Sequence, residues 1–295
     1  EGLPPEEQQW LQELKYIYDY HRSANRKKRR YYNGKVTLNE VNLGIALPAG
    51  LGKLEIGCAW GAKTVDVLAG RSMFDGFVTE NGTKSEDMDQ IMKRNHLIAE
   101  YNKAVKEELK YGCAFAAVSG EEDDARVRFY SPHCAAASWN AHEGRIRYGF
   151  AFEDARRDES DVTWSPEHVN FYTDTDIWEL DRIGGTWYAT QNPHYFGEPL
   201  MVALIWDATN DKPFGQSRLK EPVRRLIQGY VRTVANATIG LEFATSPQKY
   251  LLGVSDEQYD MLIDNKFKQY VGSILYSTNN PETGEKPNFG QLSQG

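Results

Sequence analysis

One long amphipathic segment constrains this chain more than any other feature. It is DKPFGQSRLKEPVRRLIQGYVRTVANATIGLEF, residues 211–243. Apolar side chains recur in it every three or four residues, which is the repeat of one face of a helix. They are Leu219, Val223, Leu226, Tyr230, Val234, Ala237 and Leu241. Pro222 fits only the first turn, so the helix is expected to begin near Glu221 and to form a rod of roughly 30 Å. A narrow seam on such a rod is typical of packing against neighbouring helices.

The length and composition of the chain limit the classes of protein to which it can belong. With 295 residues, the chain is long enough for one large domain or two smaller ones. Its three cysteines, Cys58, Cys113 and Cys134, predict free thiols in a reducing compartment. The longest apolar runs are too short to span a bilayer and no signal peptide opens the chain, so we expect a soluble protein that is not exported. Because the sequence starts at Glu1 without Met and stops after NFGQLSQG, it is expected to be a fragment of a longer protein.

The net charge of −8 argues against tight binding of duplex DNA by the whole surface, because such binding uses many phosphate contacts. One local basic run stands out within RSANRKKRRYYNGK. Its patch consists of Arg26, Lys27, Lys28, Arg29 and Arg30. The run follows residues 6–22, which have helical periodicity, and cations suit the C-terminal end of a helix. We interpret the patch as a solvated helix end, with contact to nucleic acid as the alternative.

Two more helices are expected before the middle of the chain. Residues 60–73 have an apolar side that consists of Val65, Leu68 and Met73. A longer helix is expected between Ser85, a suitable N-cap, and Gly112, a suitable stop. Its apolar stripe repeats by sevens at Ile91, Ile98 and Val105, and two amides fall on the same stripe at Asn95 and Asn102. Since a buried amide must find hydrogen-bond partners, these two asparagines are interpreted as structural.

Residues 113–206 predict a region of short antiparallel strands. The segments are CAFAAVS, RVRFYS, RIRYGFAF, VNFYTD, DIWELD, TWYATQ and PLMVALIW. Gly184-Gly185 fits a two-residue hairpin turn, which needs positive φ at both positions. After the long helix, residues 246–254 and 273–278 predict strands on either side of a helix at 255–272. The fold class is therefore α+β, with mixed helices and antiparallel sheet, one long helix and a small α/β module.

The sequence contains no convincing catalytic motif. GCAWGAKT, residues 57–64, suggests a phosphate loop, but only three residues separate its glycines and Ala62 precedes the lysine. His133, Cys134 and His142 suggest metal ligands, yet an adjacent His and Cys do not readily point at one ion from a strand. Ordinary sheet residues are the favoured interpretation. We expect no enzyme activity, no cofactor and no metal, and the architecture favours an assembly protein.

Several segments nevertheless resemble one known family. They are RYYNGKVTL, WGAKTVDVLAGRSMFDGF, RNHLIAEYNKAVKEELKYGCAFAAV, PLMVALIWDATNDKPFGQSRLKEPVRRLIQGYVRT and EFATSPQKYLLG. Together, and in this order, they are similar to the portal protein of long-tailed bacteriophages and their prophage copies, the head-to-tail connector. The similarity covers nearly the whole chain. Its most specific pieces are PFGQSR before the long helix and SPQKYLLG after it.

The resemblance implies a plan for the chain. Residues 1–210 would be the wing, 211–243 the first stem helix with its leading loop, and 244–295 the clip, while a second stem helix and a crown are not found in the sequence. Portal subunits form a ring, typically a dodecamer, at one vertex of the virion capsid after assembly in the host cytoplasm. The implied partners are identical subunits, the terminase motor, head-tail adaptor proteins, capsid and scaffold proteins, and double-stranded DNA that passes through without sequence-specific binding.

Three arginines lie on the far side of the expected stem helix: Arg218, Arg225 and Arg232. The ordinary interpretation is that they face solvent or form ion pairs with a neighbouring subunit, and contact with DNA is the alternative. Twelve copies of the chain would sum to roughly −96, a field that repels DNA from the channel wall. Two other classes stay open: a nucleic-acid processing enzyme that uses the basic run, and a generic binding module of an assembly.

Overall fold

A computed structural model describes most of the chain. The described residues are 2–37, 55–78, 81–82, 85–120, 124–152, 166–245, 249–252, 279, 283–284, 286 and 288–291. The helix expected at 255–272 and the strand expected at 273–278 lie outside these ranges. Within them, five helices combine with antiparallel sheets, so the α+β fold class is confirmed. None of the described helices is long and apolar enough to cross a membrane.

Helix α1, Pro5–Tyr32, opens the fold and is longer than the sequence predicts. It begins with proline and two glutamates in its first turn, which suit the positive end of the helix dipole. The backbone N–H of Asn33 closes the helix on the carbonyl of Arg29 at 2.9 Å, and Gly34 follows with φ 70°. The basic run therefore forms the last turns of the helix, because no residue before Asn33-Gly34 interrupts it.

Helix α2 spans Trp60–Ala69, and Val65 is fully buried on its inner side. Met73 was expected on the same side, but this prediction is wrong. The helix ends at Gly70, so Met73 belongs to the following loop, where it is 82% exposed.

The long helix expected between Ser85 and Gly112 is two helices, α3 (Glu86–Arg94) and α4 (Leu97–Tyr111). Both ends agree with the prediction: the Ser85 hydroxyl accepts a hydrogen bond from the backbone N–H of Met88, and Gly112 ends α4 with φ 112°. His96 interrupts the middle with a left-handed φ of 50°. This break rotates α4 about its axis, so its buried face no longer follows the seven-residue spacing of apolar side chains seen in the sequence. As a result, Ile98 and Asn102 are exposed, contrary to the prediction.

Two antiparallel sheets follow. The five-stranded sheet has the order β5-β6-β7-β8-β9, and the three-stranded sheet has the order β10-β3-β4. Their strands are β3 Cys113–Ser119, β4 Arg126–Tyr130, β5 Ala135–Asn140, β6 Arg145–Phe152, β7 His168–Tyr172, β8 Asp176–Ile183, β9 Thr186–Pro193 and β10 Met201–Ile205. Gly184 and Gly185 join β8 to β9 with φ of 60° and 91°, which confirms the predicted hairpin turn.

Three apolar clusters hold these elements. The first packs the start of α1 against the five-stranded sheet, and the second lies between the two sheets around Phe115, Tyr172 and Met201. The third joins the end of α1, a short hairpin, α2, α4 and α5. The hairpin consists of β1 (Lys35–Thr37) and β2 (Glu55–Gly57). We call this third set the junction cluster.

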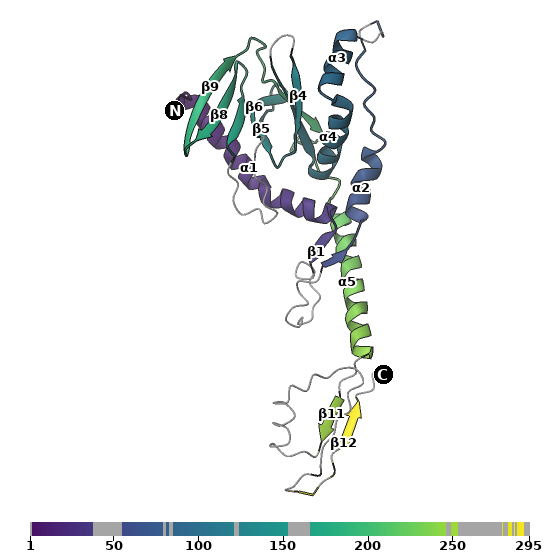
Figure 1. Cartoon of the computed structure of the whole chain (residues 1–295). Coiled ribbons are helices and arrows are strands. Elements are labelled where there is room, and N and C mark those ends of the chain that lie inside the picture. The colour runs from purple at the N-terminus through teal and green to yellow at the C-terminus, as the bar shows by residue number, and fades with distance from the viewer. Residues whose placement is uncertain are drawn as a thin grey trace.

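Helix α5, Glu221–Thr245, begins where the sequence predicts and leads away from the body of the molecule (Figure 1). Beyond its far end, β11 (Lys249–Leu252) pairs with β12 (Asn288–Gln291). A strand around 249–252 was predicted, whereas its partner β12 was not. The division at residues 210 and 243 stays a prediction, and the helix itself continues to Thr245.

Candidate functional site

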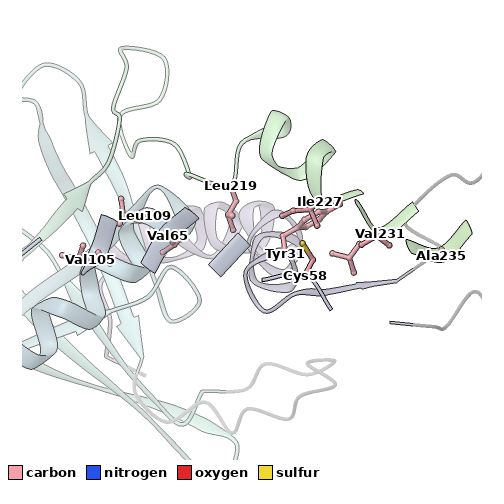
Figure 2. Packing of buried hydrophobic residues seen from close by; sticks show 11 residues of the cluster. Tyr31, Cys58, Val65, Val105, Leu109, Leu219, Ile227, Val231 and Ala235 are labelled. Carbon is pink, nitrogen blue, oxygen red and sulfur yellow. The ribbon is translucent and has the colours of Figure 1, made fainter. Parts of the chain in front are cut away.

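The first half of α5 buries one face in its own chain. Leu219, just before the helix, and Ile227, Val231 and Ala235 within it are at most 1% exposed. They are spaced by four or eight residues, so they form one stripe that points into the junction cluster (Figure 2). Tyr31 at the end of α1 lies beside Ile227 in this view. The α5 helix is thus anchored at its root by ordinary core packing.

Hydrogen bonds tie the segment before α5 to the end of α4. The hydroxyl of Ser217 donates to the carbonyl of Lys110 at 2.5 Å and accepts from the backbone N–H of Leu219 at 2.9 Å. The backbone N–H of Arg218 donates to the carbonyl of Leu109 at 2.8 Å. Further along, the Gln228 amide donates to the hydroxyl of Tyr31 at 2.6 Å. The direction in which α5 leaves the body is therefore set by both α1 and α4.

Two glycines allow the close approach of backbones at this root. A Cβ on Gly61 of α2 would lie 2.2 Å from the carbonyl oxygen of Tyr31, so α2 contacts the end of α1 without room for a side chain. A Cβ on Gly215 would lie 2.2 Å from the carbonyl oxygen of Trp206, and Gly215 has φ 72°. Both positions need glycine for space, and Gly215 needs it for conformation as well.

A second apolar face of α5 stays uncovered by the described residues. Leu226 is 66% exposed, and Tyr230 is exposed beside Trp60 of α2, with ring centroids 5.1 Å apart. A groove of about 540 Å³ runs between the two helices, and we call it the α2–α5 groove. Its lining includes Trp60, Val67, Arg218, Val223 and Leu226. Apolar side chains thus extend from α2 onto the outer side of α5.

The seven apolar residues of the predicted stripe divide between these two faces. Leu219 is buried, and Val223 and Val234 are partly buried. Leu226, Tyr230, Ala237 and Leu241 are exposed, although the ring of Tyr230 still contacts Trp60 of α2. Sequence reasoning missed Ile227, Val231 and Ala235. A repeat of four that runs through Leu219, Val223, Ile227, Val231 and Ala235 was the available signal.

The three arginines have different surroundings. Arg218 precedes the helix, and its guanidinium lies 5.7 Å from the centre of the Trp206 ring. The Nε of Arg225 donates to a carboxylate oxygen of Glu221 at 3.1 Å, which is an ion pair within one helix. Arg232 is exposed further along α5. Their contact with other subunits or with DNA stays a prediction.

The basic patch does not form one exposed surface. The ammonium of Lys28 turns inward and donates to the carbonyl of Tyr111 at 2.8 Å, and burial lowers the pKa of this lysine. Arg26 and Arg30 are partly buried, whereas Lys27 and Arg29 are exposed. The end of α1 is therefore a junction between structural elements, which agrees with the helix-end interpretation of the run.

The residues considered as metal ligands are separated. The ring of His133 contacts Tyr111 edge-on at 4.8 Å, Cys134 is buried, and His142 is exposed after β5. No group of three suitable ligands occurs among the described residues. None of the three cysteines forms a disulfide, as predicted, and the structure buries all three. Burial raises the pKa of Cys113 to about 12. Such a thiol is protonated at neutral pH.

Comparison with known proteins adds one strong match. A family model described as "Phage portal protein, SPP1 Gp6-like" matches residues 11–204. No curated protein matches the chain. Among solved structures, the neck of an empty GTA particle, computed with C6 symmetry, is similar at 11% identity and a TM-score of 0.40. That match covers 81% of this chain and 59% of the other, so the chain spans less than two thirds of that relative.

Proposed function

The chain belongs to the SPP1 Gp6-like family of phage portal proteins, whose model matches residues 11–204, and from this membership we propose that it is a structural subunit of a portal ring at a capsid vertex. Identical copies, a dodecamer in the family's usual form, would surround the channel through which DNA enters and leaves. In this proposal residues 1–210 are the wing, 211–243 the stem helix with its leading loop, and 244–295 the clip.

The observation that carries this proposal is the uncovered apolar face of α5. One face of α5 is already buried in the junction cluster. Leu226, Tyr230 and Leu241 lie along the outer side, and Leu226 and Leu241 are each 66% exposed. Full burial of one such leucine contributes about 1.5–3 kcal/mol. An outer apolar stripe on a projecting helix suits a neighbouring copy of the same helix. In this proposal the two contacting surfaces of each copy differ, so the contact is heterologous, and such contacts form a ring when the rotation between neighbours closes.

The charge of the chain suits a conduit for DNA. The net charge is −8 per chain, and a ring multiplies it, so the wall repels the phosphate backbone instead of retaining it. Arg225 and Arg232 on the exposed side of α5 then serve as partners for carboxylates of a neighbouring subunit. The proposed docking partners are the terminase motor during packaging and head-tail adaptor proteins afterwards, with capsid and scaffold proteins around the wing. No step of this function requires a cofactor.

Light scattering and electron microscopy of the purified chain test the assembly directly. We expect ring-shaped oligomers that form reversibly with protein concentration. Leu226→Glu should shift the population to smaller species, because it places a charge on the outer stripe of α5. The matched control is Ile98→Glu, which adds the same charge at an exposed apolar position of α4. A wild-type chain that stays monomeric at the highest soluble concentration would contradict the proposal.

A further inference from the structure

Strand β9 ends the five-stranded sheet at an edge with which no described strand pairs, and Gly2 lies near it, since a Cβ on Gly2 would be 3.5 Å from the Ala189 carbonyl oxygen. It pairs with β8 over its whole length without a bulge, and within the described part of the chain no strand pairs with its other side. Natural edge strands usually carry charges, an interior proline or a bulge that prevents further pairing. β9 has no charged residue, and Pro193 is its last residue. By contrast, the edge strand β4 of the other sheet carries Arg126 and Arg128.

An apolar groove runs beside this edge. It has a volume of about 690 Å³ and lies between the first turns of α1 and the β7–β9 part of the sheet. Leu11 of α1 lines one side, and Val169 and Leu180 of the sheet line the bottom. Helix α1 packs on β5 and β6, so it leaves the β9 side of the same sheet less covered. We call this space the α1–β9 groove.

The groove opens along the strand edge and not only onto one face of the sheet. Trp187, Tyr188 and Ala189 all line it, although they are consecutive residues of β9. Since successive side chains of a strand point to opposite faces, three lining residues in a row place the groove along the edge. A ligand in the groove therefore has both apolar surface and strand backbone within reach.

The rim of the groove is cationic. Lys15, Arg22 and Arg182 line it together with a single acid, Asp19. This local excess of positive charge contrasts with the net charge of −8 of the chain. The rim therefore favours a ligand that brings carboxylates to the charged side of an otherwise apolar space.

From these features we propose that the α1–β9 groove binds an extended acidic segment of a partner protein. The segment adds a strand to the open edge of β9, inserts alternate apolar side chains into the groove, and places a Glu or Asp beside Lys15. Main-chain hydrogen bonds to an edge strand and pockets for every second side chain are a known mode of peptide recognition. The strand edge selects a peptide over an amphiphile such as a fatty acid, which has no backbone to pair. This proposal does not depend on assembly of the ring.

The test uses the whole chain and a synthetic probe. The probe is a fluorescein-labelled peptide matched to the 8 residues of β9. It alternates leucine and threonine and ends in two glutamates. We expect saturable binding by fluorescence anisotropy, and slower hydrogen exchange at backbone amides of residues 186–193 when the peptide is present. Lys15→Glu should weaken binding about fivefold, because it reverses a rim charge at an exposed position. Lys103→Glu, the same change on exposed α4, should leave binding unchanged.

A second probe separates strand addition from simple apolar contact. It has the same sequence with every second backbone nitrogen methylated, which removes the hydrogen-bond donors along one side. Loss of at least about tenfold in affinity supports the proposal. Equal binding of both probes would overturn it, as would no binding at millimolar peptide. Protection of residues 186–193 that rises with protein concentration alone would show that a second copy occupies the edge, and would also overturn it.

Discussion

Two adjacent residues of α5 show how sharply burial changes along this helix. Ile227 is fully buried in the junction cluster, whereas Leu226 is 66% exposed. Both are large aliphatic residues in one regular helix, so the local sequence does not distinguish them. Their different roles in folding and assembly come from what the rest of the chain places against each side.

We therefore expect Ile227→Ala and Leu226→Ala to separate stability from assembly. Ile227→Ala should lower the free energy of unfolding by about 2–5 kcal/mol, because it leaves a cavity in a packed cluster. Leu226→Ala should change it by no more than about 0.5 kcal/mol, since the side chain is mostly solvated. Urea unfolding of both variants measures the difference. Equal losses of stability would contradict the assignment of the two faces.

A second residue-scale prediction concerns the two helical glycines Gly61 and Gly229. Gly61→Ala should destabilise the protein although alanine favours helix, because the new Cβ would lie 2.2 Å from the Tyr31 carbonyl oxygen and α1 and α2 would have to separate. Gly229→Ala should stabilise it by about 0.5–1 kcal/mol, since no atom lies within 4 Å of the added Cβ. Thermal unfolding of the two variants shows whether each substitution raises or lowers the stability. A stabilising Gly61→Ala would show that the helix contact is looser than described.

At the scale of elements, the break between α3 and α4 is held by Asn95. Its amide nitrogen donates to the carbonyls of Ile91 and Ala125, and its amide oxygen accepts from the backbone N–H of Val127. The side chain thus closes α3 and attaches it to the start of β4. The interpretation of Asn95 as structural was correct: one partner is Ile91 in the same helix, and the other two, Ala125 and Val127, lie at the start of β4.

Replacement of Asn95 should be costly, whereas replacement of its neighbour should not. Asn95→Ala is expected to cost about 1–3 kcal/mol, because the Ala125 carbonyl and the Val127 N–H lose the hydrogen bonds that the amide makes to them. His96→Gly should be neutral or stabilising, since glycine accepts the φ of 50° that strains other residues. Chemical denaturation tests both changes. A destabilising His96→Gly would indicate that the imidazole, and not the backbone, holds the break.

The contact between α1 and β6 predicts an alkaline loss of stability. Burial, together with the hydrogen bond that its hydroxyl donates to Glu13 at 2.6 Å, raises the pKa of Tyr148 to about 12 from its ordinary value of 10.0. Between these values the unfolded chain releases a proton that the folded chain keeps, so stability is full below pH 10 and falls as the pH rises towards 12.

Tyr148→Phe should reduce, but not abolish, this loss of stability at alkaline pH. Burial raises the pKa of Tyr32 and of Cys113 to about 12 as well, so most of the slope should remain in the variant. Tyr195→Phe is the control, because Tyr195 is 98% exposed and its replacement should leave the slope unchanged. The measurement is the urea midpoint between pH 9 and 12. An identical pH profile for Tyr148→Phe and wild type would contradict the prediction.

At the scale of the whole molecule, α5 connects a folded body to a distal hairpin (Figure 1). The outer side of α5 carries both apolar and cationic side chains. We expect the double charge reversal Arg225→Glu and Arg232→Glu to weaken ring assembly without loss of the fold. Arg218 is unsuitable for this test because it also packs over Trp206. The measurements are oligomer mass, circular dichroism and phage yield in complementation. An unchanged oligomer mass and phage yield would show that these arginines are not part of the proposed interface.

Much of the secondary structure followed from the sequence. The strands of residues 113–206, the hairpin at Gly184-Gly185, the cap at Ser85 and the start of α5 all depend on residues close in sequence, which is why local patterns predict them. The order of several segments also indicated the portal family, and the family match over residues 11–204 confirms the family, although PFGQSR and SPQKYLLG lie outside the matched range. These signals are local patterns in the sequence, so they can be recognised without knowing which segments pack against each other in the fold.

The tertiary structure alone decided which surfaces are covered. Residues 219–241 carry two apolar stripes, and the sequence does not say which one the body of the protein buries. The break at His96 and the inward turn of Lys28 likewise depend on distant partners, Val127 for Asn95 and Tyr111 for the lysine. The α1–β9 groove exists because α1 packs over β5 and β6 and leaves the β9 end of the same sheet less covered. Burial is a property of contacts between segments far apart in the chain, and periodicity within one segment does not contain that information.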